Sequence, residues 1–152
     1  MKASVILPAY NEEKNIGNVI KKIPDEYEII VVDDGSKDDT LDVAKKLGCV
    51  CIRLNKNYGK GFACRTGAKI ASNKNIVFMD SDGQLNAWEI PKMISALKTC
   101  DLVVGTRNMK SIPTQRKISN NSFLLRAAVC MASMIITPGR KKNSSCPSVL
   151  TP

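Results

Sequence analysis

The chain has 152 residues, 43% hydrophobic and 24% charged, a composition that argues against a wholly disordered or fibrous protein. Its length suits one domain with a core built around a single sheet. The formal charge of +9 comes mainly from residues 102–152, which hold eight Lys or Arg and no Asp or Glu, whereas residues 1–101 hold 15 basic and 14 acidic residues. Such a basic segment either binds phosphate-bearing ligands, anionic membranes or nucleic acid, or is solvated charge.

The cysteines favour a reducing compartment, and the apolar stretches predict no membrane-spanning segment. Six cysteines form no CxxC pair and the chain has no histidine, so no zinc pattern is present. Cys49 and Cys51 are expected to be small core residues on one face of a strand. The N-terminus lacks signal-peptide character, and the apolar stretch over residues 123–137 contains Arg126 and is shorter than the ~20 residues of a spanning helix. We therefore expect a cytoplasmic protein without a transmembrane segment, with peripheral contact at the cytoplasmic membrane face left open.

Apolar runs and helical spacings alternate along the first two thirds of the chain. Strands are expected at residues 3–7, 28–32, 50–54, 75–79 and 101–105, and helices at residues 11–23, 38–47, 61–71 and 88–98. Trp88 is expected to anchor packing at the start of the fourth helix, and Arg65, Lys69 and Lys74 to form the solvent face of the third. This alternation predicts an α/β fold, a Rossmann-like three-layer αβα sandwich with a mainly parallel sheet.

Beyond residue 106 the alternation fades. Residues 111–119 are expected to form a polar, basic loop, residues 121–136 one more helix, and residues 137–152 an irregular tail. The chain is thus divided into a main domain over residues 1–118, a C-terminal helix of the same domain over residues 119–136, and a basic tail over residues 137–152.

Polar side chains and glycines follow each expected strand. These strand ends are residues 8–12, 33–36, 55–61, 80–84 and 105–108. In an open parallel sheet, ligands bind outside the carboxyl ends of the strands, so these residues are the candidates for chemistry. Four of the five strand ends carry groups suited to a nucleotide diphosphate and its metal.

The acidic pair at the fourth strand end is the strongest candidate. If the strand continues through Asp80 and Asp82, their carboxylates leave the same face. Two hard oxygen ligands suit Mg²⁺ or Mn²⁺ that also binds phosphate oxygens, with Gln84 as a further oxygen ligand or water anchor. The alternative is a helix-capping turn, because Asp-Gly is ordinary loop chemistry. The position after a buried strand favours the metal site.

Two other strand ends have a structural and a functional interpretation each. Residues 33–36 form either a turn with Ser36 and Asp39 as a capping box, or an acidic site that accepts hydrogen bonds from a base or ribose; both roles can coexist. Gly59 and Gly61 either permit close backbone approach to a ligand or begin a helix after a plain loop. The chain has neither the GxxxxGK[ST] nor the GxGxxG motif, which excludes those two phosphate-binding loops.

An aromatic residue and two arginines complete the candidates. Tyr10 either stacks on a base or covers the end of the sheet. Arg107 and Arg116 either neutralise diphosphate charge as a leaving group departs or are solvated at the surface.

Five ordered motifs together resemble family 2 glycosyltransferases, and most closely the dolichol- or polyprenol-phosphate mannosyl- and glucosyltransferase branch. They are VILPAYNEE at residues 5–13, VVDDGS at 31–36, NYGKG at 57–61, MDSDGQ at 79–84 and VGTR at 104–107. The resemblance covers residues 3–118. It implies a GT-A fold, a UDP- or GDP-sugar donor of the GDP-mannose or UDP-glucose type, inversion at the anomeric carbon, and Mg²⁺ or Mn²⁺.

The resemblance also implies a role for each matching residue. The nucleotide pocket would be lined by Pro8, Ala9, Tyr10, Glu12, Asp34, Lys60 and Asp80. The metal and diphosphate would be held by Asp80, Asp82 and Gln84, and catalysis would involve Asp82, Arg107 and Arg116. In this branch the acceptor is a dolichyl or polyprenyl phosphate, and because its phosphate is the nucleophile, electrostatic positioning matters more than a strong base.

The C-terminal region departs from the family pattern. Family members usually continue with an acidic, Ser-Gly-Phe-containing segment on the acceptor side, and residues 135–142 lead into no such segment. We therefore expect a chain truncated or altered at this end, which is either an active transferase or a catalytically incomplete nucleotide-sugar-binding module. A basic nucleic-acid-binding domain is a remote alternative, since the tail lacks interleaved aromatic residues and the strand-end carboxylates would have no role.

Overall fold

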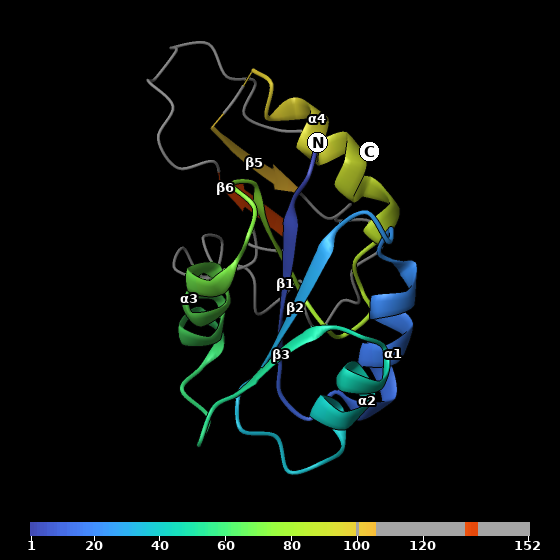
Figure 1. Cartoon of the computed structure of the whole chain (residues 1–152), viewed down its shortest axis with the longest axis vertical. Helices are drawn as coiled ribbons and strands as arrows, with labels where there is room; N and C mark the ends of the chain where they lie inside the picture. Colours follow the sequence, from blue (N-terminus) through green and yellow to red (C-terminus); the bar gives the residue numbers. More distant parts are fainter. Residues whose placement is uncertain (100, 106–132, 137–152) are drawn as a thin grey trace, which may run out of the picture.

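A six-stranded sheet forms the centre of the computed structural model, which describes residues 1–99, 101–105 and 133–136 (Figure 1). The strand order is β3-β2-β1-β4-β6-β5. The strands are β1 (Ser4–Ala9), β2 (Glu28–Asp33), β3 (Val50–Arg53), β4 (Ile76–Met79), β5 (Leu102–Gly105) and β6 (Ser133–Ile136). The helices are α1 (Glu13–Lys22), α2 (Thr40–Lys46), α3 (Lys60–Ile70), the short 3₁₀ helix η1 (Ala87–Glu89) and α4 (Ile90–Ala96). The predicted α/β class is confirmed.

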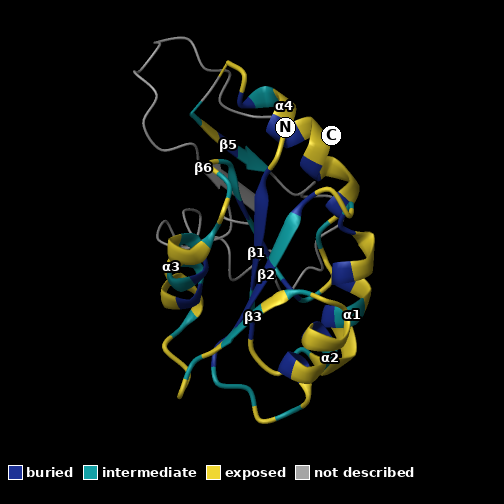
Figure 2. Ribbon diagram, viewed as in Figure 1, coloured by how far each residue is buried: buried dark blue, intermediate teal, exposed yellow. Residues whose placement is uncertain are grey.

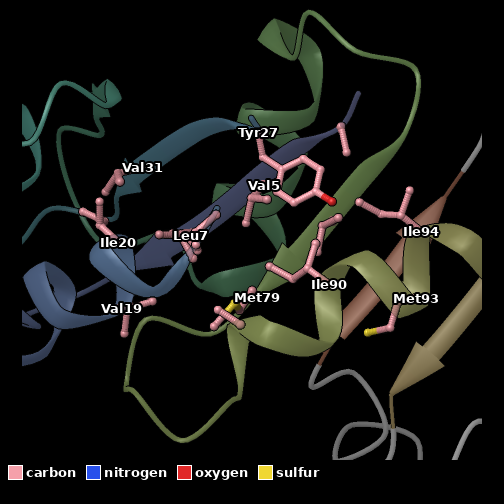
Figure 3. Packing of buried hydrophobic residues seen from close by; sticks show 14 of the residues in the cluster. Val5, Leu7, Val19, Ile20, Tyr27, Val31, Met79, Ile90, Met93 and Ile94 are labelled. Atoms are coloured by element: carbon pink, nitrogen blue, oxygen red, sulfur yellow. The ribbon is translucent and has the colours of Figure 1, made fainter. Parts of the chain in front are cut away.

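Helices cover both faces of the sheet, as Figure 1 shows with α3 on one side and α1, α2 and α4 on the other. The strands can be continuous apolar runs because both of their faces are buried. On the side of α1 and α4, Val5 and Leu7 pack with Ile20 and Ile90 in the larger core cluster (Figure 3). On the other side, Ile6, Ile30 and Val32 pack against Ala63 of α3, and Figure 2 shows the buried strands between the exposed outer faces of the helices. These are the three predicted layers.

A glycine lets α3 approach the sheet closely. A Cβ atom at Gly67 would lie 2.6 Å from Cγ2 of Ile6 and 3.1 Å from Cγ2 of Val32. No side chain fits at this position without moving the helix or the strand residues beneath it. Gly67 thus sets the depth at which α3, and the loop before it, sit on the sheet.

The direction of strand addition reverses at β1. Strands β2 and β3 lie on one side of β1 and β4 lies on the other, with β1 to β4 all parallel. Such a reversal opens a crevice at the carboxyl edge of the sheet, between the loops that follow the neighbouring strands. The chain therefore places the ends of β1, β2, β3 and β4 at one edge.

The prediction of a helix over residues 121–136 was wrong for its last part, where strand β6 forms instead. Residues 133–136 form a strand antiparallel to both of its neighbours, with Ile135 paired to Val77 of β4 and to Val103 of β5. The slot between β4 and β5 supplies backbone hydrogen-bonding partners on both sides, which local apolar periodicity does not reveal. The rest of that predicted helix, the basic loop over residues 111–119 and the tail over residues 137–152 lie outside the described residues.

The expectation for Trp88 was wrong. Its side chain is 73% exposed in η1, and neighbouring Ala87 and Ile90 enter the core instead. Cys49 and Cys51 do pack against the larger core cluster, and burial raises the pKa of Cys49 to about 11, so its thiol stays neutral. Within the described part of the chain, the helices are too short or too polar to cross a membrane.

Candidate functional site

The loops after four parallel strands surround one cavity of about 310 Å³. Its lining residues are Pro8, Ala9, Tyr10, Glu12, Asp34, Asn57, Gly59, Lys60, Asp80, Ser81 and Asp82. They come from the ends of β1, β2, β3 and β4 and the loops beyond them. The cavity therefore occupies the crevice that the strand order creates.

The loop after β1 is fixed by hydrogen bonds to the loop after β2. The backbone N–H of Asn11 donates to Ser36 Oγ at 2.9 Å, and Asn11 Oδ1 accepts from the backbone N–H of Lys37 at 2.9 Å. The next residue, Glu12, donates its backbone N–H to Thr40 Oγ1 at 2.8 Å. Asn11 has a φ of 54°, a left-handed conformation that Asn tolerates better than most residues. This turn holds Tyr10 and Glu12 at the cavity.

Tyr10 lies at the exposed rim of the cavity. Its side chain is 43% exposed, so it covers the end of the sheet only in part. On the β4 side, the hydroxyl of buried Ser81 donates to the carbonyl of Pro8 at 2.9 Å and ties the two loops together. An exposed ring beside a polar cavity suits stacking on a planar ligand.

Asp33 is a buried structural carboxylate. It is 0% exposed, and Oδ2 accepts from Nε of Arg53 at 2.7 Å while Oδ1 accepts from the backbone N–H of Ser36 at 2.9 Å. The hydrogen bond to Asp33 raises the pKa of the Arg53 guanidinium. The predicted capping box of Ser36 and Asp39 is wrong, because Asp39 caps α2 without a side-chain hydrogen bond and the Ser36 hydroxyl accepts from Asn11.

Asp34 orders the loop after β3. It is 4% exposed and accepts the backbone N–H groups of Tyr58 and Gly59, each at 2.8 Å. The neighbouring Gly35 has a φ of 77°, and a Cβ atom there would lie 2.7 Å from the carbonyl carbon of Lys56. A carboxylate has about four acceptor positions, so Asp34 can receive these two N–H groups and a ligand donor as well.

Strand β4 ends at Met79, so the expected continuation of the strand through Asp80 and Asp82 was wrong, and both residues lie in the loop after it. They line the cavity with a lysine beside them. Asp80 forms an ion pair with Lys60, the first residue of α3. Oδ1 of Asp82 accepts the backbone N–H of Gln84 at 3.0 Å. The two carboxylates and the ammonium group bring both signs of charge to one wall of the cavity.

The donor set at this wall fits a hard divalent cation that also binds a ligand. Within the described ranges, no three His, Cys, Asp or Glu side chains are grouped as a metal cage. Mg²⁺ is typically held by one or two carboxylates and completes its coordination with waters and substrate phosphates. Asp80 and Asp82 offer the two carboxylates of that pattern at one wall of the cavity.

The structure brings most of the predicted site residues together. Those that line the cavity are Pro8, Ala9, Tyr10, Glu12, Asp34, Lys60, Asp80 and Asp82. Gln84 is not among the lining residues, and Arg107 and Arg116 lie outside the described residues. Gly59, one of the two glycines expected to permit close approach of a ligand, lines the cavity as well. Asn57 and Ser81 also line it and were not predicted, although their place in the same strand-end motifs was a signal for them.

Comparisons with known proteins agree with this arrangement. The model of glycosyl transferase family 2 matches residues 4–145. The dolichol-phosphate mannosyltransferase of Pyrococcus furiosus is 39% identical over 146 residues, covering 86% of this chain and 42% of that protein. The undecaprenyl-phosphate 4-deoxy-4-formamido-L-arabinose transferase of Proteus mirabilis is 30% identical over 149 residues, covering 90% of this chain and 43% of that protein.

A solved structure matches the fold. Glucosyl-3-phosphoglycerate synthase from Mycobacterium tuberculosis, in complex with Mn²⁺, UDP and glucosyl-3-phosphoglycerate, superposes with a TM-score of 0.65 at 26% identity, covering 90% of this chain and 56% of that one. The chain belongs to glycosyltransferase family 2, and its fold is of the GT-A type. It spans about half the length of these proteins.

Proposed function

We propose that this chain is the nucleotide-sugar-binding part of an inverting glycosyltransferase, which moves a hexose from a UDP- or GDP-sugar to a dolichyl or polyprenyl phosphate. The observation that carries the proposal is the convergence of four strand-end loops on one cavity with Asp80, Asp82 and an exposed Tyr10. The names of the Pyrococcus and Proteus relatives support a polyprenyl-type phosphate as acceptor. An acceptor of this kind would require contact with a membrane.

Each part of the cavity has a chemical task in this proposal. Tyr10 stacks on the base, and Asp34 accepts a hydrogen bond from the nucleoside while holding its loop. Asp80 and Asp82 hold Mg²⁺ or Mn²⁺, which supplies positive charge to the diphosphate. Lys60 places a second positive charge at the same wall.

The proposed reaction needs no side-chain nucleophile. An oxygen of the acceptor phosphate attacks the anomeric carbon on the face opposite the nucleoside diphosphate. The new carbon–oxygen bond forms as the bond to the diphosphate breaks, which inverts the configuration. The work of the chain is to orient the donor and to stabilise the departing diphosphate. In this proposal Arg107 and Arg116 neutralise the charge of the diphosphate as it departs.

A nucleotide-sugar-binding module without turnover is the second candidate. The specific observation in its favour is that every described lining residue lies between positions 8 and 82, in the strand-end loops assigned to the donor. The two candidates share the donor site and differ on the acceptor side. Donor binding without transfer would favour the module.

Calorimetric titration tests the donor site. GDP, UDP and their sugars are titrated into the protein with and without Mn²⁺, and at least one nucleotide is expected to bind only with the metal. Asp82→Ala should weaken that binding by about tenfold or more, because one charged ligand is lost. The matched control is Asp42→Ala, which removes a carboxylate of α2 whose side chain is 62% exposed. Absence of metal-dependent binding by every nucleotide would reject both candidates.

Transfer is measured separately. The protein is incubated with a radiolabelled nucleotide-sugar and a polyprenyl phosphate in detergent, and the lipid product is extracted. Sugar on the lipid supports the transferase. Donor binding in calorimetry with no lipid product supports the module.

A further inference from the structure

The sequence around α3 has a one-sided charge. Residues 54–79, from the end of β3 through α3 to β4, hold five Lys or Arg and no Asp or Glu. The α3 helix covers its face of the sheet on the side opposite α1, α2 and α4 (Figure 1). The described surface over α3 is therefore basic, although residues 1–101 as a whole are nearly balanced in charge.

Exposed aromatic rings lie within this basic surface. Tyr58 is 44% exposed and Phe62 is 38% exposed, and their rings stack with centroids 4.7 Å apart. The Lys56 ammonium lies 5.1 Å from the centroid of the Tyr58 ring, and the Arg65 guanidinium lies 5.5 Å from that of Phe62. Apolar rings and cations thus occupy one surface.

The helix continues this pattern along its outer face. Phe62, Arg65 and Lys69 are spaced by three and four residues, so they share one face of α3, and Ile70 is exposed beside them. The α3 surface is defined by Lys56, Tyr58, Phe62, Arg65, Lys69 and Ile70. It carries three cations and three apolar side chains.

We propose that the α3 surface binds an anionic lipid bilayer. Lysine and arginine are attracted to anionic headgroups, and exposed tyrosine and phenylalanine rings favour the boundary between headgroups and acyl chains. Single-stranded nucleic acid fits less well, because bases stack on open ring faces and each ring here already has the other ring and a cation as neighbours. The aliphatic Ile70 adds apolar area that a bilayer accepts.

The α3 surface adjoins the cavity. Asn57, Gly59 and Lys60 line the cavity and alternate along the chain with Lys56 and Tyr58 of the surface. A bilayer bound at the α3 surface therefore lies beside the wall that holds the Lys60–Asp80 ion pair. This inference extends the proposed lipid-phosphate acceptor, and lipid binding is measured without any sugar donor so that it can fail independently of transfer.

Sedimentation with vesicles tests the charge part of the proposal. The full 152-residue chain is expected to bind phosphatidylcholine vesicles that contain about 30 mol% phosphatidylglycerol and to bind pure phosphatidylcholine poorly, with binding weakened by salt. Arg65→Gln with Lys69→Gln should lower the partition coefficient by roughly 25-fold, about fivefold for each charge. The matched control is Lys21→Gln with Lys92→Gln, which removes two exposed cations from α1 and α4 over the other face of the sheet.

Tryptophan emission tests the orientation. The sole tryptophan, Trp88, is expected to keep its emission maximum when anionic vesicles are added. Phe62→Trp in a Trp88→Phe background should give a blue shift and quenching by brominated lipid. Circular dichroism of each variant confirms that it is folded.

Three outcomes would overturn the proposal. The first is no binding to anionic vesicles at low ionic strength. The second is equal binding by the Arg65 and Lys69 double variant and the unaltered chain, which would place the contact elsewhere, for instance in residues 102–152. The third is binding of a labelled oligouridylate without binding of vesicles, which would make the surface a nucleic-acid site.

Discussion

Two consecutive aspartates at the end of β2 have different structural tasks. Asp33 is paired with Arg53 at the end of β3, and Asp34 accepts two backbone N–H groups from the loop that follows. Both are buried, so neither is a simple surface acid of a turn. The cavity therefore depends on Asp33 and Asp34, which order the surrounding backbone, as well as on Asp80 and Asp82, which line it.

Asp34→Ala is expected to cost both stability and ligand binding. The substitution leaves the N–H groups of Tyr58 and Gly59 without their charged acceptor, so the free energy of unfolding should fall by about 2–3 kcal/mol. Nucleotide binding should be lost because Gly59 and Lys60 shift with the loop. Urea unfolding followed by circular dichroism measures the first effect and calorimetry the second.

Asp82→Ala provides the comparison at the same cavity. Asp82 is only partly buried, so this variant should lose metal-dependent nucleotide binding while its free energy of unfolding changes by less than about 1 kcal/mol. Equal stability of the two variants would contradict the loop-ordering role of Asp34.

At the scale of elements, α3 depends on one glycine for its close packing. Alanine favours a helix over glycine by about 1 kcal/mol, yet at Gly67 the added methyl group would meet Ile6 at 2.6 Å. Gly67→Ala is therefore expected to lower the free energy of unfolding by about 1–3 kcal/mol, as overpacked cores do. Urea unfolding measures the change.

Gly61→Ala is the matched control in the same helix. Nothing lies within 4 Å of the position of its added Cβ atom, so it should leave stability unchanged or raise it by up to about 1 kcal/mol. If Gly67→Ala were as stable as Gly61→Ala, close packing of α3 on the sheet would not limit this fold.

Most elements and the position of the cavity could be predicted from the sequence. The strands β1 to β5 and their intervening helices follow from apolar runs and helical spacing, and parallel strands bring their ends to one edge whatever the details of the loops. Strand β1 continues through Pro8 to Ala9, since a proline near a strand end removes only one N–H donor.

The sequence-based predictions failed where contacts with residues distant in the chain determine the local structure. A short apolar segment such as residues 133–136 fits a helix end and a strand equally well, and only the slot between β4 and β5 makes it β6. Trp88 was misjudged because helix position alone does not say which way a ring points. The partner of Asp33 is 20 residues away, and no local pattern marks Arg53.

At the scale of the whole molecule, β6 joins β5 to the rest of the sheet. Within the described ranges, β5 pairs with β6 and with no other strand. Ile135→Pro removes a backbone N–H from the middle of this connection and should lower the free energy of unfolding by at least about 2 kcal/mol. Urea unfolding measures the loss, and Ile135→Val, which keeps the backbone donor, should change it little. Equal stability of the two variants would contradict the pairing of β6 between β4 and β5.

The order of the cavity residues along the chain has a consequence for biosynthesis. Every described residue that lines the cavity precedes position 83, and the strands that carry them follow one another from β1 to β4. Proteins are made from the N-terminus and begin to fold during synthesis. The described walls of the cavity have thus left the ribosome before β5 and β6, so β1 to β4 and their loops can assemble first and the last two strands then complete the sheet beside them.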